Sequence, residues 1–168
     1  MYLKENNLLP SGQSAYRDHH STETAVLRVL SDILLALDSR NIAVLALLDL
    51  SAAFDSVDHA TLLQRLRTSY GLGGSAITWF TSYLHNRTQY VRLSGSRSTN
   101  IAVPKGVPQG SVLGPILFLL YTADLLQFVQ RHHLHPHAYA DDTQIYGSCY
   151  PSDASTLQQC ISDFIDDV

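Results

Sequence analysis

The sequence predicts an α+β fold in which a mostly antiparallel sheet is backed by helices. Three observations lead to this prediction. Residues 22–39 repeat apolar side chains at helical spacing, residues 42–50 (IAVLALLDL) form a continuous apolar run of strand length, and two later segments alternate like β-hairpins. The predicted order along the chain is therefore helix, strand, two helices, hairpin, loop, helix, hairpin, helix.

The first predicted elements are a helix and a strand. Ser21 and Thr22 are candidate N-caps for a helix that runs to about Ser39. Its apolar face is expected to use Val26, Leu30, Ile33, Leu34 and Leu37. The run at residues 42–50 ends in a single carboxylate, Asp49, and is typical of a central strand that is buried on both faces.

Two helices and a hairpin are predicted next. Residues 59–70 (HATLLQRLRTSY) and 75–86 (SAITWFTSYLHN) read as two helices, and the breaker GLGG separates them. Asp58 is the expected N-cap of the first of these helices, which gives it a structural role. The segments TQYVRLSG and RSTNIAVP alternate well enough to predict a hairpin around Gly95 and Ser96.

The last part of the chain contains the most apolar helix and a second hairpin. After the loop PKGVPQG, a helix is expected over residues 111–130 with Ser111 as its cap. Its apolar stretch is interrupted by a Gly-Pro pair and an aspartate, which favours a buried helix over a membrane span. HAYA and TQIYG predict a hairpin with Asp141 and Asp142 at or beside its turn, and a last helix begins near residue 152.

The composition is that of a globular protein. The chain has 168 residues, 45% of them hydrophobic and 15% charged, which is enough for one domain with a sizeable core and excludes the disordered class. The two cysteines form neither a metal-binding spacing nor a disulfide framework, so a reducing compartment is expected. The N-terminus, MYLKENNLLPSGQ, lacks the layout of a signal peptide, and we therefore expect an intracellular location without a membrane.

The distribution of charge is more informative than its sum. A net charge of −4 argues against a dedicated nucleic-acid binder. Nevertheless, residues 87–105 contain no acid and carry Arg87, Arg92, Arg97 and Lys105. From residue 132 onward there is no Lys or Arg, while Asp141, Asp142, Asp153, Asp163, Asp166 and Asp167 accumulate. These regions are either solvated faces of opposite sign, or a basic hairpin that holds a polyanion beside a metal cluster.

Three short segments could together carry chemistry: LLDLSAAFD, GVPQGSVLGP and YADD. Each alone is uninformative, since aspartates are common in surface turns. Two adjacent carboxylates, Asp141 and Asp142, make each other costlier to ionise. Carboxylates on two separate strands can instead share divalent cations, and two such ions support phosphoryl transfer. Oxygen ligands of this kind are the ones that Mg²⁺ prefers.

With these segments in place, the sequence resembles the reverse transcriptase domain of non-long-terminal-repeat (LINE-type) retrotransposons. The matching pieces are SGQSAYRDHHSTETA, LLDLSAAFDSVDH, WFTSYLHNRTQYV, GVPQGSVLGPILFLLYTADL and YADDTQIY, in that order, and they cover roughly residues 8–168. The resemblance implies a polymerase palm-like antiparallel sheet backed by helices, with partial fingers and no thumb. It describes residues 1–168 as a single partial domain, with a fingers-side helix region over about 1–40 and a palm with inserted fingers-side helices and hairpin over about 41–168.

The resemblance also assigns the metal site. Asp49 and Asp141 are implied to be the main metal ligands, Asp142 an accessory acid of the same cluster, and the backbone carbonyl of Leu50 the group that completes the metal shell. All three aspartates are thereby predicted to be catalytic. The implied cofactors are two Mg²⁺ ions, for which Mn²⁺ can substitute.

The nucleotide contacts rest on the resemblance alone. Phe54 matches the steric-gate position that excludes a 2′-hydroxyl, and Gln109 matches a contact to the incoming nucleotide. Gly110 is implied to keep that loop close, and Tyr139 and Ala140 to lie near the primer terminus and the nucleotide. From the residues alone, a core side chain is the favoured interpretation of Phe54, and Gln109 could be a cap of its own loop.

Two functions from different classes remain open at this point. The first is an RNA-directed DNA polymerase that adds deoxynucleotides to a DNA primer on an RNA template, at work in the nucleus. The second is a catalytically inactive, retrotransposon-derived remnant or binding module that keeps the palm fold. Arg87, Arg92, Arg97 and Lys105 are the candidate nucleic-acid contacts. The oligomeric state is left open.

Overall fold

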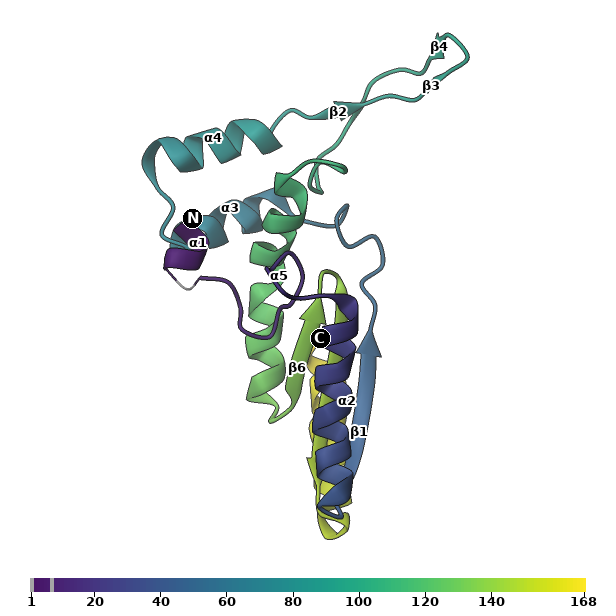
Figure 1. Cartoon of the computed structure of the whole chain (residues 1–168). Coiled ribbons are helices and arrows are strands. Elements are labelled where there is room, and N and C mark those ends of the chain that lie inside the picture. The colour runs from purple at the N-terminus through teal and green to yellow at the C-terminus, as the bar shows by residue number, and fades with distance from the viewer. Residues whose placement is uncertain (1, 7) are drawn as a thin grey trace. The chain divides into compact units, whose positions relative to one another are not determined.

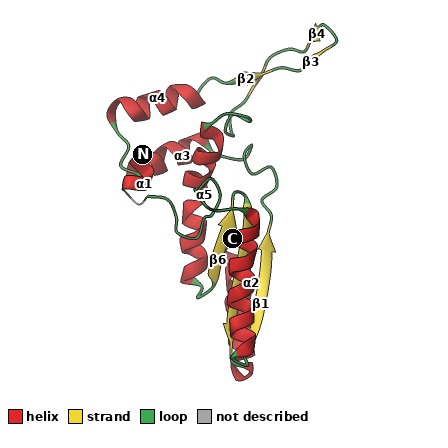
Figure 2. Cartoon of the chain, viewed as in Figure 1, coloured by secondary structure: helices red, strands yellow, loops and turns green. Residues whose placement is uncertain are grey.

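The computed structural model describes residues 2–6 and 8–168, and it divides the chain into two compact units. The first unit contains the residues up to Ser51 together with Thr122–Val168, and the second contains Ala52–Tyr121. Helices and antiparallel strands occur in the chain as Figures 1 and 2 show, so the predicted α+β class is confirmed. The predicted single partial domain and its division near residue 40 stay predictions, because these units are defined by packing alone.

The first unit is built on a three-stranded antiparallel sheet. Its strands are β1 (Ile42–Leu48), β6 (His135–Tyr139) and β7 (Asp142–Cys149), in the order β1-β7-β6. β6 and β7 are the predicted hairpin, and Tyr139 pairs with Asp142 across its turn. On the other side of β7, Leu48 pairs with Thr143.

β1 is an edge strand of this sheet, so the predicted central strand buried on both faces is wrong. Val44, Leu45 and Leu47 are 37%, 45% and 73% exposed. A continuous apolar run is compatible with burial on both faces, but which strand occupies the centre depends on pairing with distant segments. Here β7 pairs with both of the other strands and takes the central place.

The helix predicted after Ser21 is α2 (Thr22–Asp38), and its N-cap is confirmed. Ser21 and Thr24 form a reciprocal capping box that satisfies the free N–H groups at the helix start. The predicted apolar face is wrong for four of its five residues, because Ala25 and Val29 are the buried residues of this helix. Ile33, the fifth, is half-buried and lines a pocket against the sheet. The large apolar side chains that stay exposed are Val26, Leu27, Leu30, Leu34, Leu35 and Leu37.

The orientation of α2 follows from the sheet surface that it covers. α2 packs on the face of the sheet that carries Tyr146, whose hydroxyl donates to Asp32 of the helix. This face also carries His135, His137 and Gln144, which are paired with or lie next to Tyr146 in the register. Asp32 of α2 therefore lies against the sheet, and the leucine-rich side of the helix stays exposed.

The core of the first unit lies on the opposite face of the sheet. Its buried residues come from three elements and the loop before β6, and they are Val129, Leu134, Ile145, Leu157 and Phe164. α6 (Ala154–Asp167), which follows the short helix η1 (Pro151–Asp153), supplies the last two. Burying each such side chain stabilises the fold by about 1.5–3 kcal/mol. The unit begins with the short helix α1 (Tyr2–Glu5).

The second unit contains two helices and a hairpin, all as predicted. α3 (His59–Thr68) begins at Asp58, whose carboxylate accepts from the Thr61 N–H at 2.8 Å, and α4 (Gly74–Leu84) follows after the glycine-rich break. In the hairpin, β2 (Thr88–Gln89) pairs with β5 (Ile101–Ala102), and β3 (Arg92–Leu93) pairs with β4 (Ser96–Arg97). Its turn is formed by Ser94 and Gly95, one residue before the predicted position, and both have positive φ.

α5 (Leu113–Arg131) is the helix predicted over residues 111–130. The Ser111 hydroxyl accepts from the Gly114 N–H at 2.9 Å, as expected of a cap. Within the described part of the chain, α5 is the helix whose length and composition would allow it to cross a membrane, and a buried core helix passes the same test. Its side chains Leu117, Phe118 and Leu120 are buried, which agrees with the predicted core helix.

Candidate polymerase site

The three predicted catalytic carboxylates lie at the same end of the sheet. Asp49 follows directly after the last residue of β1, which is paired with Thr143. Asp142 is the first residue of β7, and Asp141 lies in the turn between β6 and β7. Continuing the register by one residue sets Asp49 opposite Asp142. The pairing of β1 with β7 thus brings together carboxylates that are far apart in the sequence.

The turn that carries Asp141 is held from its buried side by Gln13. The Gln13 side chain is only 4% exposed, and its amide nitrogen donates to the Ala140 carbonyl at 3.1 Å. Its amide oxygen accepts from the Ala140 N–H at 3.1 Å and from the Ala15 N–H at 2.9 Å. Ala140 has a φ of 56°, a region that is unfavourable for alanine and persists only when the surroundings enforce it. Gln13 therefore fixes the backbone directly before Asp141.

The segment around Gln13 is itself tied to β6. The Ala138 N–H donates to the Gly12 carbonyl and the Ser14 N–H donates to the Ala138 carbonyl, each at 2.8 Å. Ser14 Oγ and His137 Nε2 share a further hydrogen bond of 3.1 Å. These contacts anchor residues 12–14 along the strand, so the Gln13 amide reaches the turn at a defined position.

Sequence reasoning missed Gln13, although the SGQS segment belongs to the resemblance. A polar residue between a glycine and a serine is typical of an ordinary loop, and the partner of Gln13, Ala140, is 127 residues away. The only signal was that this loop precedes a capped helix in a matching segment.

Tyr16 is a second residue near the turn that the sequence did not single out. Partial burial raises the pKa of the Tyr16 phenol, and the negative charge of Asp141 and the neighbouring Tyr139 raise it further. The charge of Asp141 thus acts on the Tyr16 phenol, which belongs to the same loop as Gln13. A cation at Asp141 would counteract part of this effect on Tyr16.

The donor chemistry at this end of the sheet fits a hard divalent cation. Asp49, Asp141, Asp142 and the Leu50 carbonyl all offer oxygen, which suits Mg²⁺. Asp49 and Asp142 are exposed and Asp141 is half-buried, so they are accessible to an ion that keeps water ligands. Across residues 2–6 and 8–168, no three side chains of His, Cys, Asp or Glu converge into a complete metal-binding set.

The remaining predicted nucleotide contacts belong to the second unit. Phe54 is half-buried, and its ring packs against Phe118 with centroids 4.7 Å apart at a tilt of 34°. Phe54 therefore has a core contact and a part that solvent reaches, which is compatible both with a core side chain and with the steric-gate position. Gln109 is exposed, and its amide donates to Asp55 Oδ1 at 3.3 Å.

The GVPQG loop is held against the Phe54–Asp55 turn through Gly106. Gly106 has a φ of 84°, and a Cβ there would lie 2.9 Å from Asp55 Cα and 3.0 Å from Asp55 O. The Val107 N–H donates to the Phe54 carbonyl at 2.9 Å. At Gly110 (φ 73°), a Cβ would meet nothing within 4 Å. The close backbone contact within this unit is thus at Gly106, whereas Gly110 supplies a left-handed backbone conformation.

The four candidate cationic contacts fall into two groups. The Arg87 guanidinium donates to the Gly106 carbonyl at 2.8 Å, and the buried His59 Nε2 donates to the same oxygen at 2.8 Å. Lys105 forms a backbone bridge with Asp58 and lowers the pKa of that carboxyl, after the larger effect of the hydrogen bonds from Thr61. Both cations therefore support the loop. Arg92 and Arg97 lie on the hairpin itself.

A family comparison now adds to this geometry. The model of the family "Reverse transcriptase (RNA-dependent DNA polymerase)" matches residues 1–168. The chain belongs to this family. Its members generally use divalent metal ions, in agreement with the oxygen-rich end of the sheet. The family predicted from the YADD, PQG and DLSAAFD segments is confirmed.

Curated proteins that are similar to this chain come from mobile elements. The chain is 34% identical over 167 residues to the probable RNA-directed DNA polymerase from transposon BS of Drosophila melanogaster. This match covers 95% of the chain and 18% of the relative. The chain is 37% identical over 125 residues to the polymerase from transposon X-element, and 32% identical over 142 residues to that from mobile element jockey, both of the same organism. These matches cover 74% and 82% of this chain, and 14% and 15% of the relatives. The chain thus spans less than a fifth of the length of these relatives.

A solved structure shows the fold independently of close sequence similarity. The chain resembles apo telomerase from Candida tropicalis, truncated from its C-terminal domain, with a TM-score of 0.63 at 14% identity. The match covers 90% of this chain and 32% of the telomerase chain. The palm-like α+β fold is confirmed by this likeness.

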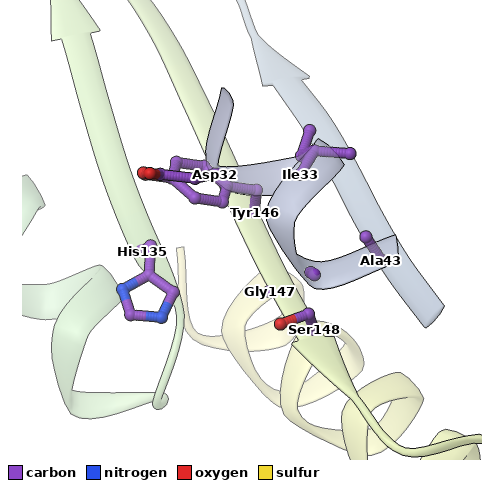
Figure 3. A pocket seen from close by; sticks show the side chains of 8 residues that line it. Asp32, Ile33, Ala43, His135, Tyr146, Gly147 and Ser148 are labelled. Carbon is purple, nitrogen blue, oxygen red and sulfur yellow. The ribbon is translucent and has the colours of Figure 1, made fainter. Parts of the chain in front are cut away.

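The first unit contains a pocket, shown in Figure 3, whose lining includes none of the predicted site residues. It has a volume of about 300 Å³ between α2 and the sheet, and its lining includes Asp32, His135 and Tyr146. The Tyr146 hydroxyl donates to Asp32 Oδ2 at 2.6 Å. Burial, followed by Asp32, raises the pKa of Tyr146 to about 12. This pocket contains none of the carboxylates at the β6–β7 turn.

Proposed function

We propose that this chain carries the catalytic centre of an RNA-directed DNA polymerase, with Asp49, Asp141 and Asp142 as its acidic residues. The observation that carries the proposal is the pairing of β1 with β7, which brings these three carboxylates to one end of the sheet. Asp49 follows β1, Asp142 begins β7, and Asp141 lies in the turn before β7 that Gln13 holds in place. Three acids gathered in this way suit the binding of divalent ions better than the support of a surface loop.

In this proposal, side chains and backbone groups of the chain bind the metal ions and orient the acid Asp141. Asp49, Asp141 and the Leu50 carbonyl would hold the ions, and Asp142 would add negative charge beside them. Gln13 holds the Ala140 backbone so that Asp141 keeps one position. When bound, two Mg²⁺ ions supply the Lewis acidity that activates a primer hydroxyl and stabilises the departing oxygen in phosphoryl transfer.

The substrates of this proposal are an RNA template, a DNA primer and deoxynucleoside triphosphates. The family description, an RNA-dependent DNA polymerase, supports this class of substrate. Phe54, Gln109, Gly110, Tyr139 and Ala140 stay the predicted nucleotide contacts, since they match the family's positions. An intracellular, nuclear location is part of the same proposal.

The alternative is a remnant or binding module that keeps the palm fold without catalysis. The observation in its favour is that no three acidic, histidine or cysteine side chains converge into a metal-binding set in the described residues. The two functions differ in whether the carboxylates bind a divalent ion at all.

Binding of Mn²⁺, followed by paramagnetic broadening of NMR signals, tests the proposal. The chain and its Asp49→Asn and Asp141→Asn variants are titrated, with circular dichroism as the control for folding. Asp163→Asn, an exposed acid on α6, is the matched control for loss of one negative charge. We expect saturable binding with broadening centred on the β6–β7 turn, lost in the first two variants and kept in the control. Absence of binding in the well-folded chain supports the remnant and contradicts the proposal.

A further inference from the structure

Helix α2 carries a row of large apolar side chains that the fold leaves exposed. Four leucines recur at intervals of three, four and three residues, a spacing that keeps them on one face of the helix. A valine lies on the same face, about one turn before the second leucine. These five side chains are between 46% and 61% exposed and are named the leucine stripe: Val26, Leu27, Leu30, Leu34 and Leu37.

The leucine stripe lies on the side of α2 that is next to β1. Ile33 lines the cavity of Figure 3 together with Ala43 of β1, whereas Arg28 lines a neighbouring cavity together with Pro136 of β6. On the surface of the helix, Ile33 borders the leucine stripe and Arg28 lies on the other side. α2 and β1 also lie side by side in Figure 1. The stripe therefore begins where the helix meets the edge strand of the sheet.

Two leucines of β1 extend this apolar surface. Leu45 is paired with Tyr146, whose hydroxyl bonds to α2, so Leu45 and Leu47 both point to the face of the sheet that α2 covers. They are 45% and 73% exposed. Together with the stripe they expose roughly 700 Å² of apolar surface, more than the about 300–600 Å² of the largest patch on a typical monomer. Each partner in a standard stable interface buries about 800 Å², which is a similar area.

The leucine spacing reads the same in both directions along the helix. Leu27 and Leu37 lie five residues before and after Asp32, and Leu30 and Leu34 lie two residues before and after it. A second α2 that packs antiparallel and crosses at the level of Asp32 brings Leu27 against Leu37 of the other copy. It also brings Leu30 against Leu34. The stripe is thus complementary to itself, as a two-fold symmetric interface requires.

The charges at the two ends of the stripe favour the same antiparallel arrangement. Glu23 lies about two turns before Leu30 on the same face, and Arg40 follows the end of the helix. In the antiparallel pair, Glu23 of each copy comes close to Arg40 of the other. In a parallel pair, Glu23 would meet Glu23 and Asp38 would meet Asp38, and the helix dipoles would also repel each other.

We propose that two copies of this chain associate through the leucine stripes of α2, antiparallel and about a two-fold axis. Leu45 and Leu47 of β1 form the rim of the interface and pack against the helix of the other copy. The surface lies outside the set of predicted site residues, so this proposal does not rest on the catalytic one.

A lipid surface is the other occupant that an exposed leucine stripe could take. Helices that lie on anionic membranes carry lysine and arginine on their polar face. α2 carries one cationic side chain, Arg28, and three acidic ones, which are Glu23, Asp32 and Asp38. Its charge opposes an anionic membrane, so a second copy is the favoured occupant and the lipid surface is an outcome of the test.

Sedimentation equilibrium of the whole chain measures its mass over a range of concentration. A reducing agent is present, because Cys149 and Cys160 are free and could otherwise link two copies. We expect a reversible monomer–dimer equilibrium in which the dimer predominates at about 100 μM. We expect Leu34→Glu to weaken dimerisation by about tenfold or more, because it brings like charges into the apolar centre of the interface.

The next residue along the helix supplies the matched control. Leu35 is 63% exposed but lies about 100° further around the helix than Leu34, outside the stripe. Leu35→Glu therefore makes the same chemical change beside the interface, and we expect it to keep dimerisation within about twofold of the wild type. Where Leu34→Glu fails to fold, Leu27→Gln takes its place, with an expected weakening of about fivefold or more.

Exchange of the end charges tests the antiparallel orientation. Glu23→Arg and Arg40→Glu are each expected to weaken dimerisation by about threefold or more in dilute salt, since each creates two like-charge contacts. The variant with both changes restores the opposite pairing and is expected to dimerise within about twofold of the wild type. Wild-type dimerisation in both single variants would overturn the antiparallel arrangement.

Three further results overturn the proposal. The first is a monomer at every concentration up to about 100 μM. The second is an equal effect of Leu34→Glu and Leu35→Glu on dimerisation, which would exclude the stripe as the interface. The third is a monomeric chain that floats with vesicles of phosphatidylcholine and phosphatidylglycerol, which would assign the stripe to a lipid surface. Circular dichroism and urea unfolding of each variant are the controls for folding.

Discussion

Gln13 holds both backbone polar groups of Ala140, although the two residues are 127 positions apart. Its amide nitrogen donates to the Ala140 carbonyl and its amide oxygen accepts from the Ala140 N–H, each at 3.1 Å. Ala140 is the residue directly before Asp141 and has a positive φ. The orientation of a predicted catalytic acid thus depends on a buried amide from the N-terminal segment.

Replacement of this amide tests its positioning role. Gln13→Leu keeps the volume but leaves the Ala15 and Ala140 N–H groups and the Ala140 carbonyl without their partner. We expect a loss of about 3 kcal/mol or more in the free energy of unfolding, because three buried groups lose their partners at a cost of about 1–3 kcal/mol each. The amide hydrogens of residues 140–142 are expected to exchange faster, as measured by hydrogen exchange with NMR.

A matched variant distinguishes positioning from general loss of stability. Gln127→Leu changes an exposed glutamine on α5 and is expected to alter neither stability nor exchange at the turn. If exchange at residues 140–142 stays at the wild-type rate in Gln13→Leu, the amide does not hold the turn. Weaker Mn²⁺ binding in the still folded Gln13→Leu variant would connect this positioning to the metal site.

Gly106 and Gly110 offer a paired test of close backbone contact. Both have positive φ, but a Cβ at Gly106 meets the Asp55 backbone at 2.9 Å and one at Gly110 meets nothing within 4 Å. Gly110→Ala is expected to cost about 1 kcal/mol for its backbone conformation alone. Gly106→Ala carries that cost plus a clash with backbone atoms that cannot rotate away, for a total above about 2 kcal/mol. Urea unfolding measures both variants, and equal losses would show that the loop moves away from Asp55 without penalty.

His137 makes the first unit sensitive to acid. Burial lowers the pKa of His137 below its ordinary value of 6.5, and Arg28 and His20 lower it further, while Asp32 raises it in part. The unfolded chain therefore takes up a proton before the folded chain does as the pH falls. The stability contributed by neutral His137 is complete above pH 6.5 and is lost as the pH falls through the lowered folded-state pKa.

The variant His137→Gln removes this titration and introduces an amide that can replace the imidazole in the hydrogen bond to Ser14. We expect its free energy of unfolding to fall less than that of the wild type between about pH 7.5 and pH 5. His133→Gln, at an exposed position, is the control and is expected to follow the wild-type curve. Parallel pH profiles for all three proteins would assign the acid sensitivity to other groups. Urea unfolding at a series of pH values gives these curves.

Local elements were predictable because their signals are local. The N-caps at Ser21 and Asp58, the break between α3 and α4, and both hairpins occur as their short sequence patterns indicate. Each pattern acts within a few residues through capping hydrogen bonds, helical spacing or turn chemistry. The hairpin turn at Ser94 and Gly95 was displaced by one residue, since neighbouring turn residues differ little in preference.

Burial was predicted less well, because it depends on what packs against each face. α2 buries Ala25 and Val29 in place of the predicted leucine-rich stripe. The apolar run of β1 was assigned to the centre of the sheet, but β7 takes that place. Periodicity identifies an apolar face, whereas the partner for that face comes from segments that are distant in the sequence.

The family and the residue types of the candidate site could be predicted from short sequence segments. The segments DLSAAFD, PQG and YADD contain the acids, the loop and the turn, and these were sufficient to predict a reverse transcriptase. Only the folded chain shows that Asp49 and Asp142 lie at the same end of the β1–β7 pair, that Gln13 holds the turn, and that Gly106 makes the close contact. The physical reason is that strand register, buried hydrogen bonds and backbone contacts join residues that are far apart along the chain, and local pattern carries no record of such partners.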